Sequence, residues 1–264
     1  KSVLPWDHPL NLGPIGVTGG EPANTVCAEA DVVIGVGTRF QDFTTGSWGL
    51  FANPERKLIS LNVAAYDAMK HGAVPLQSDA LIGLQELGEA LSGYTSPGKI
   101  DGLKPDWFGK VDPLTDVPSD GNALPSDMQV IGAVQRASTE DTVVMCAAGT
   151  MPGELHKLWK ASKLGSYHME YGFSCMGYEI AGAMGIKMAQ PERDVICFTG
   201  DGTYMMANSE MATAAMMGIP FTVVVTDNRG YGCSNRLQMG TVVAEVNNLL
   251  DHSIGGENSS LDIA

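Results

Sequence analysis

The sequence predicts an α/β protein with two doubly wound parallel-sheet domains. Short apolar runs rich in β-branched residues, each closed by turn residues, alternate with segments whose apolar residues recur at helical spacing. This alternation occurs on both sides of a proline-rich stretch at residues 94–125. Alternating strands and helices are typical of an open parallel sheet that carries helices on both faces.

The first part of the chain supplies the elements of one such domain, residues 1–93. A short helix is expected at residues 23–30, followed by a buried strand at residues 31–37. A second strand is expected at residues 57–63. At residues 79–91 the apolar side chains recur every three or four positions, which predicts an amphipathic helix.

Residues 94–125 are expected to be a linker or a long surface excursion. Five prolines recur there among Gly, Asp and Ser residues, and this composition interrupts regular structure. They are Pro97, Pro105, Pro113, Pro118 and Pro125.

Residues 126–264 are expected to form the second domain. Ser126 and Gln129 match a capping box at the start of a helix. Beyond it we expect strands at 141–147, 194–199 and 221–227 and helices at 177–189 and 206–217. The many methionines of the last helix are interpreted as core filler.

The composition is that of a folded, acidic protein. The 264 residues are 44% hydrophobic and 17% charged, which is enough apolar material for a core. The net charge of -14 argues against a nucleic-acid partner, because phosphate backbones are bound by clustered cations. No apolar run reaches membrane-spanning length, so we expect no membrane partner. The five cysteines form no C-x-x-C pair, and we expect reduced thiols in a cytoplasmic protein.

Polar residues close two of the expected strands. Gly200, Asp201 and Gly202 follow the strand at 194–199, and Asn228 follows the next parallel strand. Because one helix and one return strand separate them, Asp201 and Asn228 should emerge at the same sheet edge. Mg²⁺ prefers such hard oxygen ligands and takes others from phosphates and water, while glycines let the backbone approach a phosphate closely. The pattern therefore indicates a magnesium diphosphate site, although Gly-Asp-Gly alone would be an ordinary turn.

The paired motif resembles the signature of thiamine-diphosphate (ThDP) enzymes. Longer strings resemble one family among them, the trihydroxycyclohexanedione hydrolases of myo-inositol catabolism. These strings lie at residues 149–159, 167–181 and 230–238, and residues 4–13 and 38–47 resemble the middle domain of the same family. The resemblance implies that the chain is a fragment covering a middle domain and a C-terminally truncated diphosphate-binding domain.

The resemblance also implies roles for matching residues. Asp201, Asn228 and the Gly230 carbonyl would bind Mg²⁺. Gly202 and Thr203, after Gly200, would contact the diphosphate, and Gly149 and Thr150 would contact it from the other side. Ser174 and Met176 would hold the aminopyrimidine ring, with Met176 supporting the bent cofactor. Arg229 departs from the family pattern, in which we expect His beside the ligand.

The function implied by the resemblance is ThDP- and Mg²⁺-dependent hydrolytic C–C cleavage of a cyclic 1,2-diketone, trihydroxycyclohexanedione, to 5-deoxyglucuronate. The catalytic residues stay unassigned, because the Glu that activates the cofactor is expected in an N-terminal pyrimidine-binding domain. We therefore expect a fragment that does not turn over alone, from a protein that forms a homodimer or larger oligomer through that domain. His156 and His168 are acid–base candidates by residue type. For His156 we favour a helical surface position or a satisfied hydrogen bond, whereas an active-site position stays open for His168 and Glu170.

Two alternatives remain at this point. One is another ThDP enzyme, such as an acetolactate synthase or a 2-oxoacid decarboxylase. The other is a non-catalytic module that binds a magnesium nucleotide, although no Gly-x-x-x-x-Gly-Lys-Ser/Thr loop is present.

Overall fold

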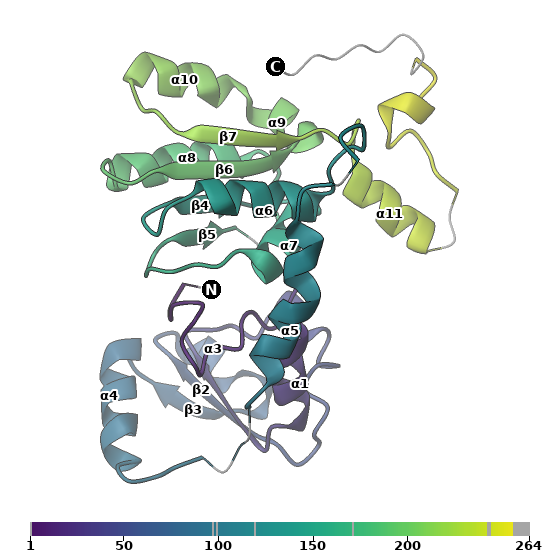
Figure 1. The fold of residues 1–264 in the computed structure, drawn as a ribbon. Helices are drawn as coiled ribbons and strands as arrows, with labels where there is room; N and C mark the ends of the chain where they lie inside the picture. The colour runs from purple at the N-terminus through teal and green to yellow at the C-terminus, as the bar shows by residue number, and fades with distance from the viewer. Residues whose placement is uncertain are drawn as a thin grey trace. The chain divides into compact units, whose positions relative to one another are not determined.

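The chain forms two compact units, which we describe separately (Figure 1). The computed structural model describes residues 2–255 apart from Pro97, Lys99, Ser119, Tyr171, Val242 and Val243. The smaller unit is Leu12–Lys110, and the larger unit joins Lys1–Asn11 to Val111–Ala264. The boundary at residues 110 and 111 lies inside the expected linker, but that stretch also forms α5 (Leu103–Val111) and η2 (Asp112–Thr115). The exact domain limits stay a prediction.

The smaller unit contains a three-stranded parallel sheet in the order β1-β2-β3. Its strands are β1 (Val32–Val36), β2 (Lys57–Asn62) and β3 (Val74–Gln77). Its helical segments are α1 (Glu21–Glu29), α2 (Asp42–Thr45), α3 (Ala65–Met69), η1 (Lys70–Gly72) and α4 (Ala80–Ala90). The two expected strands and two expected helices are confirmed within two residues at each end, whereas β3, α2, α3 and η1 were not predicted.

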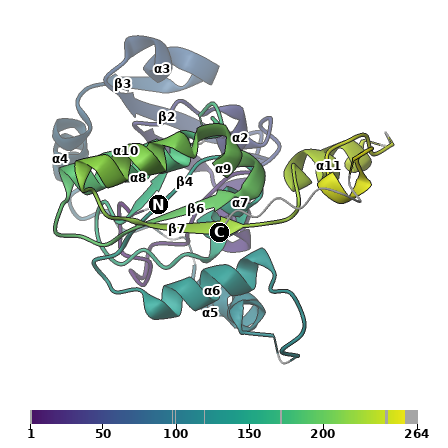
Figure 2. The same ribbon diagram turned by 90° about the horizontal axis from the view of Figure 1, so that it is seen from above.

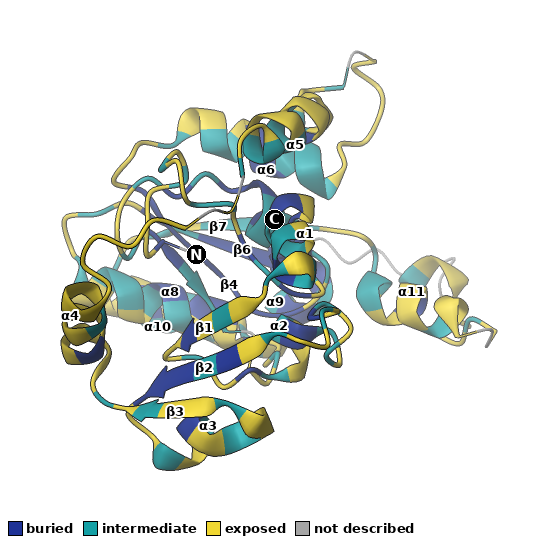
Figure 3. Ribbon diagram, turned by 90° about the horizontal axis from the view of Figure 1, so that it is seen from below, coloured by how far each residue is buried: buried dark blue, intermediate teal, exposed yellow. Residues whose placement is uncertain are grey.

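The amphipathic reading of α4 is wrong in one respect. Asp79 caps the helix, accepting hydrogen bonds from the amides of Leu81 and Ile82. Yet Leu81 and Ile82 are themselves exposed, and the buried residue of the helix is Gly83, whose missing Cβ makes room for the side chain of Leu61. Exposed positions on β1 and α4 are visible in Figure 3.

The larger unit contains a four-stranded parallel sheet in the order β5-β4-β6-β7. Its strands are β4 (Val143–Cys146), β5 (Tyr167–Met169), β6 (Val195–Gly200) and β7 (Thr222–Thr226). Its α-helices are α6 (Asp127–Ala137), α7 (Met151–Leu158), α8 (Tyr178–Ala189), α9 (Asp201–Ala207), α10 (Ser209–Met217) and α11 (Gly232–Gly240), and η3 (Leu250–His252) follows. Helices α8 and α10 lie on one face of the sheet and α6 lies on the other (Figures 1 and 2). The architecture is thus the predicted one of two parallel-sheet α/β domains.

The core of this unit lies between the sheet and α8. Val143, Met145, Val195 and Cys197 from β4 and β6 are buried against Ile180 and Ala183 of the helix. Side chains on central parallel strands are covered on both faces, which explains why β4 consists of four buried apolar residues.

The start of α6 confirms the predicted capping box. The Ser126 hydroxyl accepts a hydrogen bond from the Gln129 amide at 3.3 Å, and the Gln129 side chain accepts one from the Ser126 amide at 2.9 Å. Both bonds satisfy amides that the first helical turn leaves without helical partners.

The helix expected at residues 206–217 is corrected in two ways. It consists of two helices, because α9 begins at Asp201 directly after β6 and ends before α10 starts at Ser209. Its methionines are mostly not core filler. Met205, Met206, Met216 and Met217 are exposed, and Met211 packs against the core.

The cysteines of the described chain are all free thiols. Cys27, Cys146 and Cys197 are buried, Cys233 is partly buried and Cys175 is exposed. None of the helices in the described part of the chain has both the length and the apolar composition to span a membrane.

Candidate functional site

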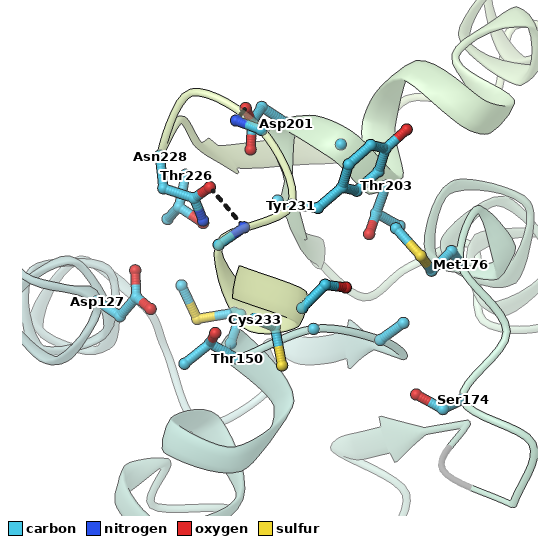
Figure 4. Close-up of a pocket in the computed structure, with 18 of the residues that line it drawn as sticks. Asp127, Thr150, Ser174, Met176, Asp201, Thr203, Thr226, Asn228, Tyr231 and Cys233 are labelled. Carbon is cyan, nitrogen blue, oxygen red and sulfur yellow. Dashed lines mark hydrogen bonds between the residues drawn. The ribbon is translucent and has the colours of Figure 1, made fainter. Parts of the chain in front are cut away.

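A pocket of about 230 Å³ opens at the carboxyl ends of the strands in the larger unit (Figure 4). It is lined by the loops after β4 and β7, by the end of β6 with the start of α9, by the loop before α8 and by the starts of α6 and α11. Every site residue expected from the sequence lines it. These are Gly149, Thr150, Ser174, Met176, Gly200, Asp201, Gly202, Thr203, Asn228 and Gly230.

Asp201 is the buried carboxylate of this pocket. It is 4% exposed and begins α9 directly after Gly200. Its Oδ2 accepts a hydrogen bond from the Gly230 amide at 2.6 Å, whereas its Oδ1 is buried and has no hydrogen-bond partner. Burial raises the pKa of the Asp201 carboxyl, and the bond from Gly230 opposes that rise. A buried carboxylate oxygen without a donor is an acceptor that a cation would satisfy.

The loop after β7 brings Asn228 and Gly230 to Asp201. Strands β6 and β7 are neighbours with Gly200 opposite Thr226, so α9 and the loop after β7 leave the sheet at the same edge. The Asn228 Oδ1 accepts a hydrogen bond from the Gly232 amide at 3.3 Å. The close approach of this loop to α9 thus follows from strand order.

A later segment shapes the same loop. The amide of Tyr231 donates to the carbonyl of Asn248 at 2.8 Å, and the amide of Leu250 donates to the carbonyl of Arg229 at 2.7 Å. Arg229 has φ 63 and forms an ion pair with Asp251 at 3.2 Å. Arg229, where the resemblance leads us to expect His, therefore helps to join the loop after β7 to η3.

Two glycines are required where the loops approach one another. A Cβ on Gly202 would lie 2.9 Å from Cδ1 of the Tyr231 ring. Gly230 has φ 138, and a Cβ there would lie 2.5 Å from the Asn248 carbonyl oxygen. Both distances are shorter than van der Waals contact, so the glycines permit the packing of this edge.

The other side of the pocket comes from the loops after β4 and before α8. Gly149 has φ 91 with open space where a Cβ would be, and the Thr150 hydroxyl accepts a hydrogen bond from Arg236. Ser174 has φ 53. This turn is held by Glu170, whose oxygens accept from the Phe173 amide at 3.0 Å and the Cys175 amide at 2.8 Å.

The acid–base candidates do not line the pocket. The His156 ring stacks on Tyr167, and Nε2 of His168 contacts the carbonyl oxygen of Gly165 at 3.2 Å. Glu170 supports the Ser174 turn from outside the pocket. Partial burial acts to raise the pKa of the Glu170 carboxyl, but the hydrogen bonds from Cys175 and Phe173 outweigh it and the pKa is lowered.

Sequence reasoning missed Asp127 and Tyr231, which line the pocket, and Arg236, which does not line it but donates a hydrogen bond to Thr150. Asp127 is the first residue of α6 and lines the pocket; burial raises the pKa of its carboxyl and Arg236 opposes that rise. The capping box predicted where α6 starts, but no residue spacing in the sequence predicted that this start would lie beside the ends of β6 and β7. Tyr231 and Arg236 fall inside residues 230–238, one of the strings that carry the family resemblance. That resemblance was the signal that could have identified them as site residues.

Comparison with known protein families matches both parts of the chain. Residues 1–87 match "Thiamine pyrophosphate enzyme, central domain", and residues 147–251 match "Thiamine pyrophosphate enzyme, C-terminal TPP binding domain". The chain belongs to the thiamine pyrophosphate enzyme family. Thiamine pyrophosphate is the same molecule as ThDP, so the pocket lies within the domain that this family uses to bind its cofactor.

Individual relatives carry a more specific name. A protein of Geobacillus thermodenitrificans is 38% identical over 100% of this chain and 46% of its own length. A protein of Clostridium perfringens is 39% identical over 93% of this chain and 42% of its own length, and one of Bacillus cereus is 41% identical over 91% and 41%. All three are named 3D-(3,5/4)-trihydroxycyclohexane-1,2-dione hydrolases, the last as hydrolase 1. The chain thus spans less than half the length of these relatives.

Proposed function

We propose that the larger unit binds ThDP with Mg²⁺ in the pocket, and that the whole protein hydrolyses a cyclic 1,2-dione. One observation carries the metal site. Oδ1 of Asp201 is buried without a partner beside Asn228 and Gly230. Among the described residues, no group of three or more His, Cys, Asp or Glu is arranged so that it could hold a metal ion. A cation here would therefore depend on few protein oxygens and on the diphosphate, as Mg²⁺ commonly does.

The residues divide into two sets by the part of the cofactor they would hold. Asp201, Asn228 and the Gly230 carbonyl would bind the metal, and Gly202 with Thr203 would approach the diphosphate beside them. The second set lies on the other loops. Gly149 and Thr150 would contact the diphosphate from the far side, and the backbone at Ser174 and Met176 would orient the aminopyrimidine ring.

The pocket residues would bind and orient rather than exchange protons. When bound, ThDP supplies a carbon nucleophile and an electron sink for cleaving a bond beside a carbonyl. In the proposed reaction water is added across the bond between two carbonyl carbons, so that one product carbon is a carboxylate and the other an aldehyde. The exposed Met176 side chain and the buried Thr203 both line this pocket.

The substrate assignment is supported by the relatives. Their printed names specify 3D-(3,5/4)-trihydroxycyclohexane-1,2-dione, and we propose the same substrate, with 5-deoxyglucuronate as product, in myo-inositol degradation. The described cysteines are free thiols, which supports a cytoplasmic location. We also propose a homodimer or larger assembly, which sedimentation of the whole protein would measure.

The first experiment is a calorimetric titration of ThDP with and without Mg²⁺. Wild type is compared with Asp201→Asn, in which the new amide oxygen can still accept from Gly230 but the charge is lost. Asp194→Asn is the matched control, because Asp194 lies before the opposite end of β6. We expect Mg²⁺-dependent binding that Asp201→Asn abolishes and Asp194→Asn retains.

Two outcomes would contradict the proposal. Equal binding by wild type and Asp201→Asn would remove Asp201 from the site, and displacement of ThDP by Mg-ATP would favour a nucleotide-binding module. If the 264-residue chain binds nothing, the titration is repeated on the whole protein, and failure there rejects ThDP binding. Product analysis of the whole protein with the dione and with pyruvate then separates a hydrolase from an acetolactate synthase or a decarboxylase.

A further inference from the structure

Glu179 is a carboxylate buried completely inside the larger unit. It is the second residue of α8 and is 0% exposed. Its Oε1 accepts a hydrogen bond from the Ala148 amide at 2.9 Å, and its Oε2 accepts one from the Gly177 amide at 3.0 Å. Among the described residues, no Lys, Arg or His side chain forms an ion pair with it.

The two amides belong to the two loops that form one side of the pocket. Ala148 lies between β4 and the pair Gly149 and Thr150. Gly177 directly follows Met176, whose side chain lines the pocket. One carboxylate thus joins two loops that are about thirty residues apart in the chain and fixes the spacing between them.

Core stability alone does not require a carboxylate at this position. Desolvating a charge is costly, and replacing buried charged groups with apolar side chains of similar volume is often neutral or stabilising. The next residue, Ile180, fills the core between α8 and β4 with apolar atoms. The distinctive property of Glu179 is that each oxygen accepts from a different pocket loop. It can do so because α8 begins where the loop of Met176 ends and packs against β4, from which the loop of Gly149 leaves.

We propose that Glu179 is a positioning residue for the cofactor pocket. It holds the loop of Gly149 and Thr150 at a set distance from the loop of Ser174 and Met176, so that a ligand in contact with both loops fits between them. This inference rests on the proposed function, because it names ThDP as that ligand. Inorganic pyrophosphate is expected to sit beside Asp201 and to depend less on the second loop.

The test compares two ligands in three variants. In Glu179→Gln one acceptor oxygen is replaced by an amide group that faces a backbone donor, and in Glu179→Met both acceptors are lost. Ile180→Val is the matched control, since it alters the adjacent buried residue of the same helix without touching either loop amide. The dissociation constants of ThDP and of pyrophosphate, each with Mg²⁺, are measured by calorimetry together with the thermal midpoint of the ligand-free protein.

In Glu179→Gln we expect the dissociation constant of ThDP to rise about tenfold, as is common when a group that supports a binding residue is removed. Pyrophosphate should lose less affinity than ThDP, because of the two loops it would contact only that of Gly149 and Thr150, and both losses should be larger in Glu179→Met. Ile180→Val should lower the thermal midpoint and leave both affinities close to wild type. Unchanged ThDP binding, or a parallel loss of both ligands, would overturn the inference.

Hydrogen exchange separates this inference from the proposed function. If the whole protein binds neither ligand, the proposed function fails, and exchange of the Ala148 and Gly177 amides still tests the role of Glu179. Faster exchange at both amides and across 149–150 and 174–176 in Glu179→Gln, but not in Ile180→Val, supports the inference. Unchanged exchange in these loops rejects it.

Discussion

The amide of Gly230 donates a 2.6 Å hydrogen bond to Oδ2 of Asp201. This bond joins the loop after β7 to the first residue of α9 and leaves Oδ1 of the same carboxylate without a partner. The geometry of Gly230 is therefore central to the candidate metal site. The neighbouring Arg229, with φ 63, and Gly230, with φ 138, form a turn that ordinary L-residues seldom adopt.

Gly230→Ala is expected to destabilise the protein by about 1–3 kcal/mol, because a residue with a Cβ is strained at this φ and would also contact Asn248. Urea unfolding followed by circular dichroism measures the change. Gly240→Ala is the control, since Gly240 ends α11 with open space around it. Equal stability of the two variants would show that the turn tolerates a side chain.

Gly202→Ala should displace the Tyr231 ring, because the new methyl group would lie 2.9 Å from Cδ1 of that ring. The variant should lose stability, and Tyr231→Ala in the same chain should restore part of it. A double-mutant cycle measured by urea unfolding is expected to give a coupling of about 1 kcal/mol. Additive effects would mean that the ring moves aside freely.

Glu170→Gln should reduce stability at neutral pH and much less at acid pH. The hydrogen bonds from the turn lower the pKa of Glu170 in the folded protein, so the ionised carboxylate stabilises the fold above its unfolded pKa. That contribution is lost as the pH falls below the ordinary Glu pKa and through the lower pKa of the folded protein. Thermal midpoints of both proteins between neutral and acid pH should converge, and a constant difference would contradict the expectation.

Ser126→Ala should cost about 1 kcal/mol of stability, because the Ser126 hydroxyl caps α6. Ser138→Ala provides a comparison at the other end of the helix, where the hydroxyl donates to the carbonyl of Val134. Chemical unfolding of both variants measures the difference. A larger loss in Ser138→Ala would indicate that the capping box is not the more stabilising of the two contacts.

Local chemistry and strand order made several features predictable from sequence. The capping box at Ser126 depends on residues three positions apart, and the meeting of Asp201 with Asn228 follows from neighbouring parallel strands. The ThDP family was likewise predictable, because its motifs are continuous strings. The short strands β3 and β5 were missed, since four and three residues carry too little periodicity to identify a strand.

The sequence by itself determined the two α/β domains, the strand ends that carry polar residues and the family. Only the tertiary structure decided which residues from remote segments join them at the pocket. The bridge between Gly230 and Leu249, the carboxylate of Glu179 between two loops, and Asp127 beside the pocket all join segments remote in the chain. The exposure of Met216, which was expected to fill the core, was likewise decided by the tertiary structure. Periodicity reports which side chains are apolar, whereas contacts between distant segments are set by how whole elements pack.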